Sequence, residues 1–199
     1  GLIKENPFLA YKFKSENTHR TFLTKDELDS LESFQTSNES LERINDCFLF
    51  SCYTGLRYSD LNNLSPSKVI TNKKGDTWLT IQMQKTGEPL NIPLAQKAIK
   101  IIEKYKNFAE SSDQLLPLIS NQKINSYLKI LAEQVGINKI LTFHVARHTF
   151  ATTVTLSNKI PLEVVSKLLG HRSVRTTQHY AKITNDYLLE SIKQLDNQI

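Results

Sequence analysis

The spacing of apolar residues changes twice along this chain, and that change limits the folds that it can adopt. On either side of residues 68–93, apolar residues recur every three or four positions, as on one face of an α-helix. Within residues 77–84, apolar and polar residues alternate, as in a half-buried strand. A short strand over residues 68–71 precedes them, and residues 89–93 return as an edge strand that tolerates prolines. We therefore predict a mainly α fold with a small three-stranded antiparallel β-sheet (α+β).

Residues that typically begin or end helices mark the boundaries of the predicted helices. Thr24 and Glu27 form the pattern of a capping box, which starts a helix. Gly55 is placed to end the next helix, and Pro161 suits the first turn of a helix that Gly170 ends. Further helices are expected over residues 57–64, 94–108, 121–135, 142–156, 173–180 and 185–198.

Composition favours one globular domain with a polyanionic partner. The chain has 199 residues, 39% of them hydrophobic and 23% charged, which excludes a disordered or membrane-embedded class. Its formal net charge of +5 favours a partner such as nucleic acid. No apolar run is long enough to span a membrane, and the start has no apolar signal core. Cys47 and Cys52 lie in one apolar run, and we interpret them as reduced, buried thiols, which fits a cytosol.

Residues 1–20 are polar and show no clear period. We interpret them as a linker that arrives from another domain, and residues 21–199 as the domain that carries the function. The chain is then expected to be part of a longer protein.

Four short segments carry residues that suit phosphate chemistry. They are Thr54–Asp60, Gln84–Gly87, Phe143–His148 and Leu168–Tyr180. Taken singly, the basic residues read as solvated surface charges and the tyrosine as a half-buried core residue. Taken together and in this order, the segments resemble the tyrosine recombinase (phage integrase) family. The resemblance runs from about Phe22 to the end of the chain, and it extends to integrases of mobile elements such as conjugative transposons.

The resemblance implies a catalytic-domain fold and six site residues. The positions that match the family pattern are Arg57, Lys85, His144, Arg147, His171 and Tyr180. In such proteins a tyrosine attacks a DNA phosphodiester and forms a 3′-phosphotyrosine, with neither ATP, Mg²⁺ nor any other cofactor or metal required. A missing N-terminal core-binding domain would close a clamp around the DNA.

The chemistry explains why these residue types are needed. Guanidinium forks suit two phosphate oxygens at once, so Arg57 and Arg147 match the phosphate clamp. His171 would donate a further hydrogen bond to charge that develops in the transition state. By resemblance Tyr180 is the nucleophile and Lys85, at a hairpin tip, the general acid for the leaving 5′ oxygen.

His144 shares a helix face with Arg147 and could accept the proton of Tyr180. His144 and His148 are also spaced as a zinc pair, but the residues between them fit a metal poorly. Asp60 follows Arg57 by three and is expected to buttress a nearby cation. His179 is structural or faces DNA.

Other expected partners follow from charge and from the last helix. Contacts with double-stranded DNA are expected from the basic residues Lys123, Lys159, Lys167, Arg172 and Arg175. The apolar face of residues 185–198 either docks on its own domain or is donated to a neighbouring protomer in a ring of four. Accessory DNA-bending or directionality proteins are further partners, and no membrane is involved. The implied location is the bacterial cytoplasm, at the nucleoid.

Three other functions compete with recombination. A type IB topoisomerase uses the same tyrosine chemistry, and a DNA-binding regulator could keep the fold without the chemistry. A rolling-circle nuclease would need a His-hydrophobic-His metal triplet, which does not occur here. Because the Tyr180 segment is short, we also expect its hydroxyl to point away from Arg57 and Arg147 when no DNA is bound.

Overall fold

The computed structural model describes residues 21–85, 87–180 and 192. The helices are α1 (Lys25–Glu32), α2 (Glu39–Thr54), α3 (Tyr58–Asn62), α4 (Gln96–Lys104), α5 (Lys106–Ser111), α6 (Asn121–Gln134), α7 (Phe143–Thr149), α8 (Leu162–Leu168) and α9 (Arg175–Gln178). The strands are β1 (Val69–Thr71), β2 (Thr77–Gln82) and β3 (Pro89–Pro93), and the short helical turns are η1 (Pro66–Lys68), η2 (Phe150–Thr155) and η3 (Leu156–Asn158). The expected linker over 1–20 and helix over 185–198 lie outside the described residues, apart from Ile192.

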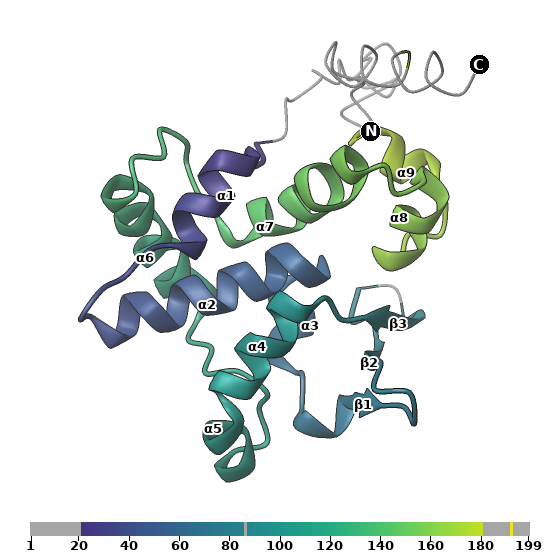
Figure 1. Ribbon diagram of the computed structural model, residues 1–199, viewed down its shortest axis with the longest axis horizontal. Helices are drawn as coiled ribbons and strands as arrows, with labels where there is room; N and C mark the ends of the chain where they lie inside the picture. The colour runs from purple at the N-terminus through teal and green to yellow at the C-terminus, as the bar shows by residue number, and fades with distance from the viewer. Residues whose placement is uncertain (1–20, 86, 181–191, 193–199) are drawn as a thin grey trace, which may run out of the picture.

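Helix α2 runs through the middle of the molecule (Figure 1). It contacts α1, α4, α6, α7 and η2, and its residues from Cys47 to Thr54 are all buried. The helix begins at the Asn38 cap and ends at Gly55, whose φ is 70°. A Cβ at Gly55 would lie 2.6 Å from a ring carbon of Phe150, so both the turn and the packing require glycine there.

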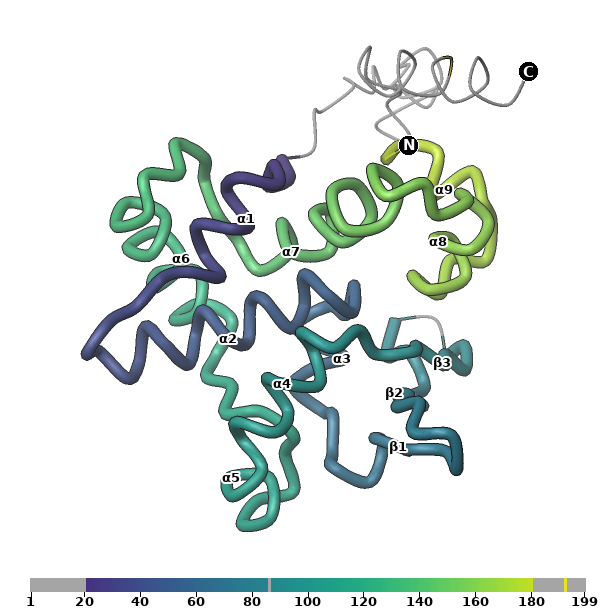
Figure 2. The backbone as a smooth tube through the Cα atoms, in the orientation of Figure 1, coloured from purple at the N-terminus to yellow at the C-terminus, as the bar shows by residue number. Residues whose placement is uncertain are grey.

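The three strands form one antiparallel sheet in the order β1-β2-β3. Leu79 pairs with Ile92 and Ile81 with Leu90, and all four side chains face the core. The alternation in the sequence therefore predicted this sheet and its buried face correctly. Figure 2 shows the β3 edge of the sheet next to α8, and β3 is in contact with α8.

The helix expected over residues 142–156 is interrupted. Helix α7 ends at Thr149, and the chain continues as a π-helical turn, η2, and a short 3₁₀ turn, η3. The hydroxyl of Thr155 donates to the carbonyls of both Phe150 and Ala151, five and four residues back, which matches the wider turn. The single-helix prediction was wrong because these local hydroxyl bonds compete with the α-helical pattern.

Two other boundaries also differ from expectation. The helix expected over 94–108 divides at Tyr105 into α4 and α5. Pro161 is the N-cap residue of α8, one position before the first helical position that was predicted for it.

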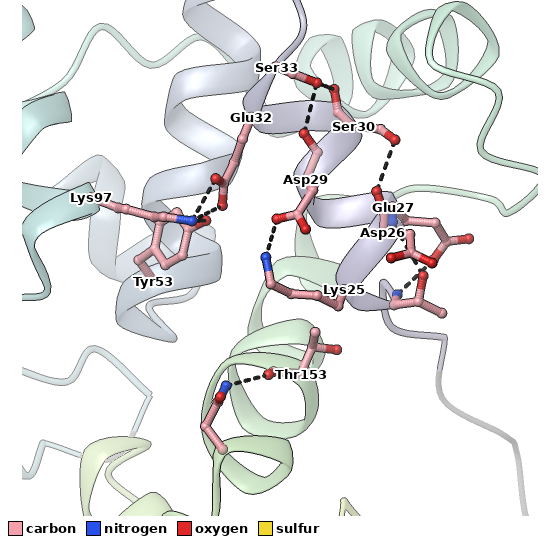
Figure 3. Close-up of polar contacts among 12 residues, drawn as sticks. Lys25, Asp26, Glu27, Asp29, Ser30, Glu32, Ser33, Tyr53, Lys97 and Thr153 are labelled. Carbon is pink, nitrogen blue, oxygen red and sulfur yellow. Dashed lines mark hydrogen bonds and ion pairs between the residues drawn. The ribbon is translucent and has the colours of Figure 1, made fainter. Parts of the chain in front are cut away.

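Helix α1 is fastened at both ends. The capping box of Thr24 and Glu27 is present as predicted. Figure 3 shows Lys97 of α4 reaching Glu32 at the other end, with Nζ–Oε distances of 2.6 Å, beside Tyr53 of α2. Among the described residues, no helix is long and apolar enough to cross a membrane.

Candidate active site

Arg147 lies at the centre of the site, with a side chain that is almost fully buried. Its residue is only 1% exposed. One guanidinium nitrogen donates to the carbonyl of Gly55 at 2.7 Å, and the other donates to the carbonyl of Leu169 at 2.6 Å. Helix α7 therefore holds this cation between the end of α2 and the end of α8.

Burial and charge both act on the Arg147 guanidinium. Burial and, after it, the positive charge of Arg57 lower its pKa to about 10, while Tyr180 and Asp60 oppose the change. The group still carries its charge at neutral pH. Two cations held near each other with little water form a strong site for an anion.

Arg57 occupies the N-cap position of α3, just after the Gly55 turn. Its Nη1 lies 3.9 Å from a carboxylate oxygen of Asp60, whose side chain is fully buried. This nitrogen is itself buried and makes no hydrogen bond in the structure. Asp60 therefore buttresses the cation, as the spacing predicted.

A cavity of about 420 Å³ opens beside Arg57. Its lining comes from the N-terminal ends of α3, α6 and α7: Arg57, Tyr58, Ser59, Asn121, Asn125, Thr142, Phe143 and His144. The polar lining and the adjacent arginine suit a phosphate group and its sugar.

His171 completes the contacts of Arg147. Its Nε2 lies 3.1 Å from an Arg147 nitrogen, and its Nδ1 lies 2.8 Å from the hydroxyl of Thr177. Because a guanidinium can only donate, Nε2 accepts here, and the neutral ring then carries its proton on Nδ1. For His171 to make the hydrogen bond expected to a phosphate, its Nε2 would have to leave Arg147.

Tyr180 is buried and faces this cluster. Its residue is 7% exposed. Its ring lies parallel to that of His171 at a centroid distance of 6.4 Å and is tilted by 44° against that of His148 at 5.2 Å. Its hydroxyl lies near enough to the Arg147 guanidinium to oppose the lowering of that group's pKa. The expectation that the hydroxyl points away from the arginines is therefore wrong for Arg147: the rings of two histidines hold the tyrosine against the cation.

His148 is the residue whose position sequence reasoning missed. It was weighed only as half of a zinc pair with His144, yet its ring contacts both Tyr180 and His144, the latter at 4.4 Å. Within the part of the chain that the structure describes, no three potential ligands gather as a metal site. A spacing of one helical turn signalled that the two histidines meet, but not that Tyr180 joins them.

The other predicted residues lie at the surface. Lys85 is exposed in the β2–β3 turn, and the amide of the preceding Gln84 donates to Asp60 at 3.0 Å. The candidate DNA contacts Lys123, Lys159, Lys167, Arg172 and Arg175 are all exposed, as is His179. Arg172 differs from the other four in pairing with Glu88 at 2.9 Å.

The family follows from comparison with known proteins. Residues 21–186 match the model of the phage integrase family. The chain belongs to the phage integrase family. The order of motifs in the sequence had indicated this membership, and the site geometry is found within the matched residues.

Tyrosine recombinases are among the proteins to which this chain is similar. A tyrosine recombinase of Thermosipho africanus (strain TCF52B) is 28% identical over 203 residues, which are 98% of this chain and 69% of that protein. The tyrosine recombinase XerA of Pyrococcus furiosus is 30% identical over 181 residues, which are 86% of this chain and 60% of that protein. The chain thus spans roughly two thirds of the length of these relatives.

Solved structures confirm the fold. A crystal structure of XerA recombinase superposes with a TM-score of 0.70 at 28% identity, covering 87% of this chain and 64% of that one. The Tn1549 transposon integrase bound to circular intermediate DNA gives a TM-score of 0.68 at 17% identity, covering 96% of this chain and 71% of that one. The second likeness shows the fold alone.

Proposed function

We propose that the chain is the catalytic domain of a site-specific DNA recombinase, an integrase that integrates or excises a mobile element. The observation that carries the proposal is that the buried Tyr180 ring lies against His171, whose Nε2 contacts Arg147. A nucleophile near the Arg147 guanidinium, with Arg57 in the same site, suits attack on a phosphodiester, whose negative charge the two guanidinium groups would bind.

The reaction exchanges one phosphodiester for another. The Tyr180 oxygen attacks phosphorus, the bond from phosphorus to the 5′ oxygen breaks, and a 3′-phosphotyrosine forms. His144 accepts the tyrosine proton, and His148, whose ring contacts both residues, lies on the path between them. Lys85 gives a proton to the leaving 5′ oxygen. Neither ATP nor a metal enters this balance.

The partners in this proposal are DNA and further copies of the protein. Double-stranded DNA fits the basic surface, and two structural neighbours were solved on DNA, the Tn1549 integrase and a lambda integrase dimer on a core site. An N-terminal core-binding domain would complete the DNA clamp, and a synapse of four protomers would align two sites through residues 185–198. Such a protein acts in the cytoplasm, at the nucleoid.

A covalent trap tests the proposal. The longest available form of the protein is mixed, in EDTA, with labelled junction DNA of its own element, nicked so that cleavage cannot reverse. We expect a band that resists denaturation with the native protein and no such band with Tyr180→Phe. The variant keeps the aromatic ring against His148 and His171, so it removes the hydroxyl while leaving the packing in place.

Three outcomes contradict the proposal. A covalent band that persists in Tyr180→Phe would place the nucleophile elsewhere. Absence of a band with DNA that the protein demonstrably binds would favour a regulator that keeps the fold without the chemistry. Relaxation of supercoiled plasmid without recombination would favour a type IB topoisomerase instead.

A further inference from the structure

The hairpin that carries Lys85 is attached to the rest of the site at three points. The Gln84 amide donates to the buried carboxylate of Asp60 at 3.0 Å. Met83 packs so closely on Gly170 that a Cβ there would lie 3.3 Å from the Met83 Cγ. On the far side of the turn, the Glu88 carboxylate accepts from Arg172 at 2.9 Å.

Two of these attachments reach the residues on either side of His171. Gly170 contacts the strand end before the turn, and Arg172 binds Glu88 after it. The turn itself is closed by the Met83 amide donating to the Glu88 carbonyl at 2.9 Å and the Gly87 amide donating to the Met83 carbonyl at 2.8 Å. A movement of Glu88 therefore moves both ends of the turn that holds Lys85.

We propose that Arg172 and Glu88 are positioning residues for Lys85: their ion pair ties the hairpin to the His171 segment and sets where the Lys85 ammonium stands. The role rests on the proposed function, in which Lys85 protonates the leaving oxygen. It also replaces the expectation that Arg172 is a contact to a DNA phosphate, because its guanidinium is already engaged by a carboxylate.

The ion pair between Arg172 and Glu88 is exposed to solvent, so we expect it to adjust the position of the hairpin only slightly. The side chains are 69% exposed at Arg172 and 44% at Glu88. Surface ion pairs of this kind are screened by salt and change an equilibrium by about two- to fivefold. We therefore expect a measurable but partial effect on the hairpin, with Asp60 and Gly170 still holding it.

Hydrogen exchange in the full chain gives the first test. In Glu88→Gln and in Arg172→Gln, the amides of Met83, Gln84 and Gly87 should exchange about two- to fivefold faster than in the native protein. The charge reversal Glu88→Arg with Arg172→Glu should restore the protection that either single reversal removes. Arg175→Gln, an exposed change on the same segment, is the matched control and should leave these amides unchanged.

Cleavage kinetics give the second test. Single-turnover cleavage of nicked junction DNA should slow by a similar factor in both single variants. A substrate with sulfur at the bridging 5′ position should remove the difference, because a thiolate leaves without a proton from Lys85. A variant that merely loosened the fold would stay slow on both substrates.

The outcomes separate this proposal from its alternatives. Unchanged hairpin exchange in both single variants overturns it. A second result would also overturn it: Arg172→Gln, but not Glu88→Gln, loses affinity for a short DNA duplex, and the slope of log affinity against log salt falls by about one. That pattern marks a phosphate contact of Arg172. If the native protein forms no covalent product while the hairpin amides still depend on the pair, the proposed function fails and the positioning stands.

Discussion

The guanidinium of Arg147 is bound by two main-chain carbonyls and by His171, all inside the protein. Main-chain acceptors cannot neutralise its charge, and the nearby Arg57 adds a second cation. The buried Asp60 carboxylate offsets only one of these two positive charges, so folding leaves a net positive charge at the site. That arrangement costs stability and prepares the site for a phosphate before DNA arrives.

The loss of stability caused by the buried Arg147 guanidinium depends on pH in a definite direction. The pKa of Arg147 is lowered to about 10 in the folded chain, mainly by burial and then by Arg57. Between that value and the ordinary arginine value, the unfolded chain binds more protons than the folded one, so stability from this group rises with pH. Below pH 10 the cost is fully present.

A bound tetrahedral anion should offset this cost. We expect phosphate or vanadate to raise the melting temperature above that in chloride of equal ionic strength. At an anion concentration ten times its Kd, the gain is about 1.4 kcal/mol, or about 3–5 °C for a chain of this size. Calorimetry of the native protein and of Arg57→Gln makes the comparison. An equal rise in both proteins would mean that the anion binds outside the arginine pair.

At the scale of elements, the clearest link is between the start of the domain and the helix that carries Arg147. The Leu23 amide donates to the hydroxyl of Thr149 at 3.0 Å, and its carbonyl accepts from the hydroxyl of Thr153. Both threonines are buried, on α7 and η2. The π-helical turn aims these hydroxyls at the incoming chain, so the irregularity has a structural use.

Removal of the Thr153 hydroxyl should weaken the attachment of Leu23 to η2. We expect Thr153→Val to lower the free energy of unfolding by about 1–2 kcal/mol, because the buried Leu23 carbonyl loses its donor. Thr152→Val is the control, since that hydroxyl donates to a local carbonyl, that of His148 four residues back. Urea unfolding measures both, and faster exchange of the Leu23 amide in Thr153→Val alone would locate the change. Equal losses in the two variants would argue against the link.

Elements specified by local patterns could be predicted from the sequence, and those specified by distant contacts could not. The capping box at Thr24, the Gly55 turn and the alternation of β2 act over a few residues, and all three are present. The π-helical turn contains two threonine hydroxyls with different partners. Thr155 donates to the local carbonyl of Phe150, whereas Thr153 donates to the carbonyl of Leu23, more than a hundred positions away. In the same way, motif order indicated the six candidate site residues, whereas the meeting of His148 with Tyr180 and of Arg172 with Glu88 required the fold.

For the whole molecule, the open question is how active sites are coupled on DNA. The sequence after Tyr180 carries apolar residues at helical spacing: Leu188, Leu189, Ile192 and Leu195. An amphipathic pattern of this kind needs an apolar surface to cover it. In the proposed recombinase that surface belongs to a neighbouring protomer, and the segment that bears Tyr180 then connects one active site to the next.

Shortening the chain to end at Lys182 tests this coupling. The covalent trap needs one active site, whereas recombination needs several. We therefore expect the shortened protein to keep most of its covalent trapping on nicked DNA. Its recombination should fall at least about tenfold, which corresponds to about 1.4 kcal/mol of lost association between protomers. A full-length variant with Leu188→Ser and Leu189→Ser is the matched control, since it keeps the chain but removes two apolar contacts, and it should behave in the same way. If the shortened protein recombined as well as the full chain, the apolar face would have no role between protomers. A loss of trapping together with recombination, with the melting temperature also lowered, would instead place that face on its own domain.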